Sequence, residues 1–108
     1  MNLYEQAEHF GLDNRLNQMM EEFAETISVA ARYRRMLSGD DTLHYSQRSL
    51  KRNMAEEIAD SKLVMEQVAY LLDITKEQID DNIDKKLIRT ERMINNGKGR
   101  DTAVAEDY

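Results

Sequence analysis

Residues 46–72, SQRSLKRNMAEEIADSKLVMEQVAYLL, contain neither glycine nor proline and decide the fold class. Apolar side chains recur along this stretch at the spacing of a helix, which predicts a long helix that begins near Ser46 to Ser49 and runs to about Leu72. Its main apolar stripe comprises Met54, Ile58, Met65, Val68, Ala69 and Leu72. A second apolar line, roughly opposite, comprises Leu63, Val64 and Leu71. Because a helix with two apolar faces is buried on both, we expect the second face to meet another subunit.

The preceding sequence predicts another long helix, with Asp13 as its N-cap and its end near Leu37. Its apolar stripe comprises Leu16, Met19, Met20, Phe23, Ile27 and Ala30. A short amphipathic helix over residues 2–10 should come before it and end at Gly11. The chain therefore begins with a short helix and a long one, separated by a single glycine.

The residues after the opening stretch predict a third long helix. Thr75 followed by Gln78 is typical of a capping box, and Asn95-Asn96-Gly97 should end the helix. We therefore expect an all-α domain over residues 1–96, followed by a flexible tail over residues 97–108. The predicted architecture is of the four-helix-bundle type, with three long helices and a short N-terminal one, completed by oligomerisation.

The composition narrows the class of protein. The 108 residues include no cysteine, which excludes disulfides and thiolate metal sites and favours a reducing cytoplasm. No apolar run is long enough to span a membrane, and no signal peptide is recognisable at the N-terminus. The net charge of −6 argues against broad binding to nucleic acid. We therefore expect no membrane association and no direct nucleic-acid binding.

Two acidic motifs on consecutive helices are the candidate site. Residues three apart share a helix face, so Glu22 lies beside Glu25, and Glu57 lies beside Asp60. At about 100° per residue, Asp60 falls near the second apolar line, where an unpaired charge is costly. Clustered carboxylates are suited to hard cations such as Mg²⁺ or Mn²⁺. The alternative is two solvated acidic faces, and Glu22 and Glu25 do lie opposite the main stripe of their helix.

The same residues carry a resemblance to a known family. Glu21-Glu22-Phe23-Ala24-Glu25 followed by Glu57-Ile58-Ala59-Asp60 is similar to the Glu-Glu-x-x-Glu and Glu-x-x-Asp motifs of the MazG-like all-α nucleoside triphosphate pyrophosphohydrolases. That family is related to the dimeric dUTPases, and the resemblance is to small phage-type members. It covers roughly residues 12–94. The two motifs lie further apart than is usual in the family, and the surplus falls in the loop over residues 39–49.

The resemblance implies an activity and roles for these residues. The family hydrolyses a nucleoside triphosphate to the monophosphate and pyrophosphate, using water activated by Mg²⁺. By this resemblance the catalytic residues are Glu21, Glu22, Glu25, Glu57 and Asp60. All of them except Glu21 would be metal ligands, and Glu21 would lie behind the ligands or orient the water. A homodimer or homotetramer in the cytoplasm of a bacterium or a phage-infected host is implied as well.

Basic residues on the third long helix are candidates for the substrate phosphates. Lys86 and Arg89 share a face of the helix, and Asn82 lies one turn earlier. By the resemblance, the positions of Lys86 and Arg89 match basic positions of the family. The alternative is that Lys86 and Arg89 stabilise the negative end of their own helix. For the chain as a whole, the alternative function is an inactive helical interaction or regulatory protein that keeps the fold.

Overall fold

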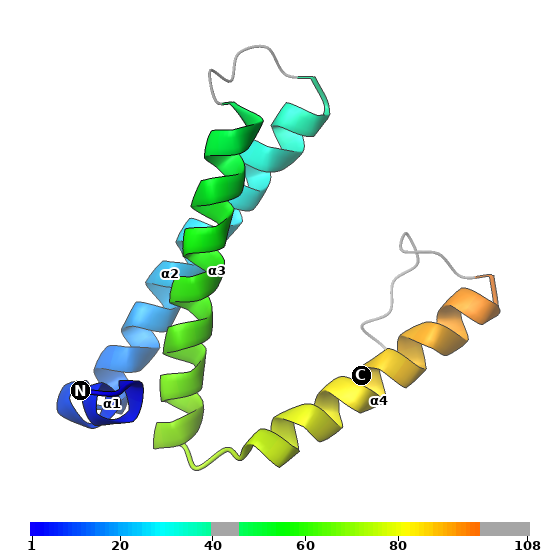
Figure 1. Ribbon diagram of the computed structural model, residues 1–108. Helices are drawn as coiled ribbons and strands as arrows, with labels where there is room; N and C mark the ends of the chain where they lie inside the picture. Colours follow the sequence, from blue (N-terminus) through cyan, green and yellow to red (C-terminus); the bar gives the residue numbers. More distant parts are fainter. Residues whose placement is uncertain (40–45, 98–108) are drawn as a thin grey trace. The chain divides into compact units, whose positions relative to one another are not determined.

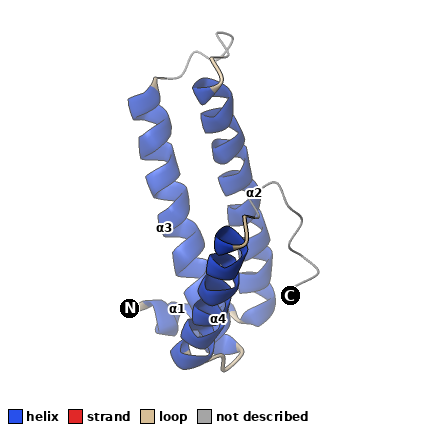
Figure 2. Cartoon of the chain, turned by 90° about the vertical axis from the view of Figure 1, so that its right-hand side faces the viewer, coloured by secondary structure: helices blue, strands red, loops and turns tan. Residues whose placement is uncertain are grey.

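The computed structural model describes residues 1–39 and 46–97, and this part of the chain contains helices and turns but no strand. The helices are α1 (Leu3–Phe10), α2 (Leu12–Leu37), α3 (Gln47–Leu71) and α4 (Lys76–Asn95), as Figures 1 and 2 show. The prediction of an all-helical chain with three long helices and a short N-terminal one is confirmed. Residues 40–45 of the predicted loop and residues 98–108 of the predicted tail lie outside the described residues.

Local capping sets where most of the helices begin. Thr75 and Gln78 form the expected capping box, in which the backbone N–H of Gln78 donates to Thr75 Oγ1 at 3.1 Å. Ser46 is the N-cap of α3, and its hydroxyl oxygen accepts a hydrogen bond from the backbone N–H of Ser49. The prediction for Asp13 is wrong, because α2 begins at Leu12 and its N-cap is Gly11. Asp13 lies in the first turn instead, where its negative charge complements the helix dipole.

The chain divides into two compact units, residues 1–73 and residues 74–108, and each is described by itself. In the first unit, α2 and α3 lie side by side and run in opposite directions (Figure 1). The short helix α1 is held against them by Gln67, which is 1% exposed. The Gln67 side chain donates to the Leu3 carbonyl at 2.9 Å and accepts from the Arg15 guanidinium at 3.0 Å. In the second unit, no residue of α4 is buried.

The interface between α2 and α3 follows a heptad pattern, with alternating steps of four and three residues. We call these positions the seam. Every seam residue is buried or half-buried. On α2 the seam comprises Arg15, Met19, Glu22, Thr26, Val29, Tyr33 and Met36. On α3 it comprises Leu50, Met54, Glu57, Ser61, Val64, Val68 and Leu71. This is the spacing with which two helices pack along their whole length, and several of its central positions are polar.

The predicted main stripes largely fall outside this seam. Ile27 on α2 is 69% exposed and Ile58 on α3 is 50% exposed. The second apolar line supplies the seam instead, through Val64 and Leu71, whereas Leu63 is exposed. Assigning the within-chain interface to the main stripes was therefore wrong. The physical reason is that polar residues occupy the middle of the seam, so the most apolar face of each helix is not its interface with the other.

The displaced stripes make a second, solvent-facing surface, which we call the outer apolar face. It consists of Met20, Phe23, Ile27, Ile58, Met65 and Leu72, all of them exposed. Each of these residues follows a seam position by one residue, which is a rotation of about 100°. A step of one residue turns the side-chain direction by this angle about the helix axis. Because α2 and α3 are antiparallel, the step from a seam position to the next residue points to the same side of the pair on both helices. The two stripes therefore form one face.

Candidate metal centre

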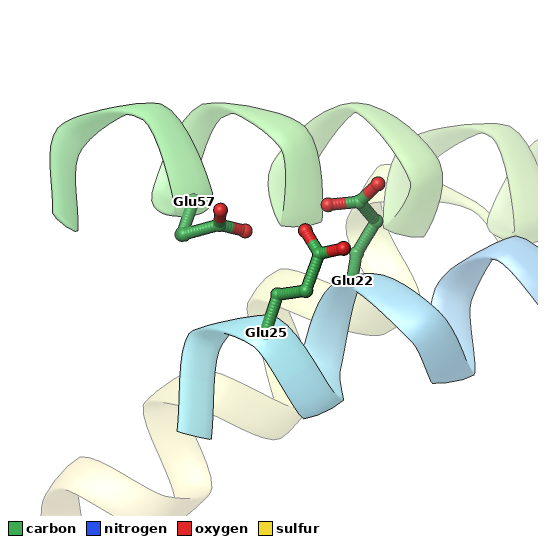
Figure 3. Close-up of side chains that lie close together, drawn as sticks. All are labelled: Glu22, Glu25 and Glu57. Atoms are coloured by element: carbon green, nitrogen blue, oxygen red, sulfur yellow. The ribbon is translucent and has the colours of Figure 1, made fainter. Parts of the chain in front are cut away.

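Three carboxylates meet across the seam of α2 and α3. Glu22 and Glu25 come from α2 and Glu57 comes from α3, and Figure 3 shows their side chains directed into the space between the two helices. One oxygen of each lies within 4.8 Å of an oxygen of the other two. Three formal negative charges at this separation repel one another, so the arrangement favours a bound cation.

Two of these carboxylates are at seam positions, and their hydrogen bonding is incomplete. Gln18 Nε2 donates to one oxygen of Glu22 at 2.8 Å. The other oxygen of Glu22 and one oxygen of Glu57 are shielded from solvent and accept no hydrogen bond from any described residue. Buried polar atoms are nearly always paired. A cation bound between the two helices would supply the missing partner to both oxygens.

The electrostatic surroundings of Glu57 point the same way. Partial burial raises the pKa of the Glu57 carboxyl, and the negative charges of Glu25, Glu22 and Asp60 raise it further, as does a hydrogen bond with Glu25. All of these influences act against the ionised form. A divalent cation would reverse them, because it favours the ionised form of every carboxylate around it.

Asp60 is placed differently from the prediction. It is exposed, and the residue that enters the seam at this level is Ser61, whose hydroxyl lies 2.9 Å from that of Thr26. The expectation that Asp60 enters a buried apolar strip is wrong, because its side chain lies one residue off the seam. The cost of burying a charge applies to Glu57 instead. Asp60 is outside the group of three, although it is near enough to raise the pKa of Glu57.

The acidic residues beside the seam gather on one side of the helix pair. Glu21, Glu25, Glu56 and Asp60 are all exposed, and each precedes a seam position by one residue. By the same geometry as before, they lie on the side opposite the outer apolar face. Glu56 shares this side of the helix pair but is outside the group of three.

The predicted phosphate ligands lie in the second unit, on α4. Asn82 and Lys86 are exposed and Arg89 is half-buried. The Asn82 side chain donates to the Gln78 carbonyl at 2.8 Å, one turn earlier on the same helix. Their spacing puts the three residues on one side of α4. Their role toward phosphate stays a prediction.

This donor set is suited to a hard divalent cation. Three carboxylates supply only oxygen ligands, and Mg²⁺ binds through a few carboxylates while it keeps several waters or binds substrate phosphates. The described residues of this group include no histidine or cysteine, which a zinc site would favour. What the site offers chemically is therefore a concentrated negative charge that can hold Mg²⁺ or Mn²⁺ at the surface of a helix pair.

Comparison with known proteins adds no relative. The sequence matches no family model, and no curated protein or solved structure is significantly similar to it. Along residues 1–39 and 46–97, no helix combines the length and the apolar character needed to cross a membrane.

Proposed function

We propose that the chain is a nucleoside triphosphate pyrophosphohydrolase that depends on Mg²⁺, with Mn²⁺ as a possible substitute. It would convert a ribo- or deoxyribonucleoside triphosphate and water to the monophosphate and pyrophosphate. The observation that carries the proposal is the meeting of Glu22, Glu25 and Glu57 across two antiparallel helices, with shielded, unpaired oxygens on Glu22 and Glu57. These acids belong to the two motifs that resemble the MazG-like family.

The positions of the acidic residues in the first unit support the roles that we propose for them. Glu22, Glu25 and Glu57 would hold the metal, and Asp60, which lies on the acidic side, would complete the ligand set. Glu21 also lies on that side, where an exposed carboxylate can orient a water molecule. When bound, the metal would neutralise the triphosphate and lower the pKa of a coordinated water. Asn82, Lys86 and Arg89 belong to the second unit, and we propose them as ligands of the substrate phosphates from the family resemblance and their shared side of α4.

The test is release of pyrophosphate from a full panel of ribo- and deoxyribonucleoside triphosphates, with Mg²⁺ and with Mn²⁺. We expect the wild-type chain to hydrolyse at least one of them and Glu57→Gln to lose the activity. Glu56→Gln is the matched control, because it removes the same charge from an exposed neighbour outside the group of three. No hydrolysis of any nucleotide by the wild-type chain would end the proposal.

The proposal includes a homodimer or homotetramer. The outer apolar face of the first unit supports it, and so do exposed apolar residues on α4: Ile79, Ile83, Leu87, Ile88 and Ile94. Large exposed apolar surfaces mark interaction sites. Light scattering at micromolar concentration should give a mass above the 12.6 kDa of one chain. A monomer would contradict this part of the proposal and leave the hydrolase part standing.

The outer apolar face also favours a second candidate function. An inactive helical interaction or regulatory protein would use this face to bind a partner helix and would have no use for a cation. It predicts no effect of Mg²⁺ on the melting temperature, whereas the hydrolase predicts stabilisation. The location proposed for either function is the cytoplasm of a bacterium or of a phage-infected host.

A further inference from the structure

One end of the α2–α3 pair is positively charged, although the chain as a whole carries a net charge of −6. This is the end where the chain passes from α2 to α3 (Figure 1). Residues 26–39 and 46–55 contain no aspartate or glutamate. We define the basic tip as the five exposed cationic residues of these ranges: Arg34, Arg35, Arg48, Lys51 and Arg52. Two aspartates of the connecting residues 40–45 lie outside the described residues.

Helix stability does not account for the three cations of the basic tip that lie on α3. Arg48, Lys51 and Arg52 occupy the first two turns of α3, and its first turn contains no acidic residue. The N-terminus of a helix carries a partial positive charge, so cations there are unfavourable. Arg34 and Arg35, in contrast, lie in the last turn of α2, where they complement the dipole. Arg48, in the first turn, therefore opposes the local helix electrostatics, and Lys51 and Arg52, in the second turn, gain no stabilisation from the dipole.

The cations of the basic tip are also available for an external anion. None of the five forms an ion pair with another described residue. A surface hollow on α2 is lined by Ser28, Ala31, Arg34, Arg35 and Ser38. Another on α3 is lined by Arg48, Lys51, Arg52 and Ala55. The small serine and alanine side chains leave room beside the guanidinium groups, so a bulky anion can approach them closely.

Contrary to the expectation from the net charge of −6, we propose that the basic tip binds a nucleic acid through its phosphate backbone. Four of its five cations are arginines, which bind phosphate oxygens in pairs. The hollows are lined by residues that avoid the seam, so the cations lie on the outer flanks of both helices. A strand that carries a charge at each phosphate can contact cations on both helices. No residue of the basic tip belongs to the acidic site, so this proposal does not depend on the proposed hydrolase activity.

The chemistry of the basic tip fits a nucleic acid better than a membrane or a protein. Leu37, 70% exposed, is the one large apolar residue that is exposed within residues 26–39 and 46–55, apart from Ile27 on the outer apolar face. A membrane-binding helix or a protein interface normally adds a cluster of apolar anchors to its charges. The overall charge of −6 restricts contact with a polyanion to the tip. Binding should therefore be local, independent of sequence and sensitive to salt.

The test is fluorescence anisotropy with labelled single strands and duplexes of about 20 nucleotides, titrated from roughly 20 to 150 mM salt. If all five cations contact phosphates of a duplex, the logarithm of the association constant should fall with the logarithm of the salt concentration with a slope no steeper than about −4.5. The triple variant Arg48→Gln, Lys51→Gln, Arg52→Gln should lower affinity by about tenfold or more and reduce the slope by about 2.7. Its helix content by circular dichroism should be unchanged, since it removes cations from a positive helix end.

The matched control is Lys62→Gln, Lys85→Gln, Arg92→Gln, which removes the same charge from exposed residues that are not members of the basic tip. It should keep more affinity than the tip variant. Equal losses in the two variants would overturn the proposal, because net charge alone would then explain binding. Absence of binding by the wild-type chain at the lowest salt would overturn it too. Binding to anionic phosphatidylserine vesicles without binding to nucleic acid would assign the tip to a membrane instead.

Discussion

Replacing Glu57 by glutamine tests whether Glu57 is a metal ligand or a residue that stabilises the fold, because the two roles predict opposite changes in the stability of the metal-free chain. In the metal-free chain, Glu57 is opposed by Glu25, Glu22 and Asp60, and its pKa is raised by burial and by these neighbours. Glu57→Gln removes that repulsion and keeps the shape of the side chain. We therefore expect the metal-free variant to be more stable than the wild-type chain at pH 7, where the wild-type carboxylates repel one another.

With Mg²⁺ the order should reverse. A cation that binds only the folded chain stabilises it by about 2.7 kcal/mol at a concentration of about 100 times its Kd. A chain of 108 residues has an unfolding entropy of about 0.23 kcal/mol/K, so the wild-type Tm should rise by roughly 12 °C. Glu57→Gln takes away the ligand that α3 contributes to the group, and most of this rise should disappear.

The assay is calorimetry of both chains, with a chelator and then with Mg²⁺. Glu56→Gln serves as the control, because Glu56 is exposed and outside the group of three, and it should keep the Mg²⁺-dependent rise. The reasoning is refuted if the wild-type Tm does not respond to Mg²⁺. It is refuted equally if metal-free Glu57→Gln melts below the wild type, since Glu57 would then be stabilising the fold.

Three further predictions concern the fold and its pH dependence. Leu50→Ala should lower the free energy of unfolding by about 2–5 kcal/mol in urea denaturation, because Leu50 is fully buried in the seam. Gln67→Ala should cost about 1–3 kcal/mol and expose residues 1–10 to proteolysis, because it leaves the Leu3 carbonyl and the Arg15 guanidinium without their shared partner. Without metal, stability should fall as the pH rises from the ordinary glutamate value of 4.5 through the raised pKa of Glu57. In that window the folded chain binds more protons than the unfolded one. Glu57→Gln should flatten this decline when the free energy of unfolding is measured by urea denaturation at several pH values. The same decline in the variant and the wild-type chain would show that Glu57 is not its source.

The acidic site was only partly predictable. Glu22 and Glu25 looked like members of a solvated face, because they lie away from the most apolar stripe of their helix. The structure puts Glu22 in the seam and brings both residues to Glu57. The sequence pattern predicts that Asp60 is buried. In the structure Asp60 is exposed, and the seam positions on this part of α3 are those of Glu57 and Ser61. These errors share one cause, which is that each helix was assigned its interface by hydrophobicity alone.

The sequence by itself determined the helices. The scarcity of glycine and proline, the cap residues Ser46 and Thr75, and the break at Gly11 are local features, and they act within a few residues of the backbone they control. The choice of interface was left to tertiary structure. The outer apolar face is more hydrophobic than the seam, yet the helices meet through a heptad row with Thr26, Ser61 and two glutamates near its middle. Which face is buried depends on the partner helix and its register, and neither is a property of one helix alone.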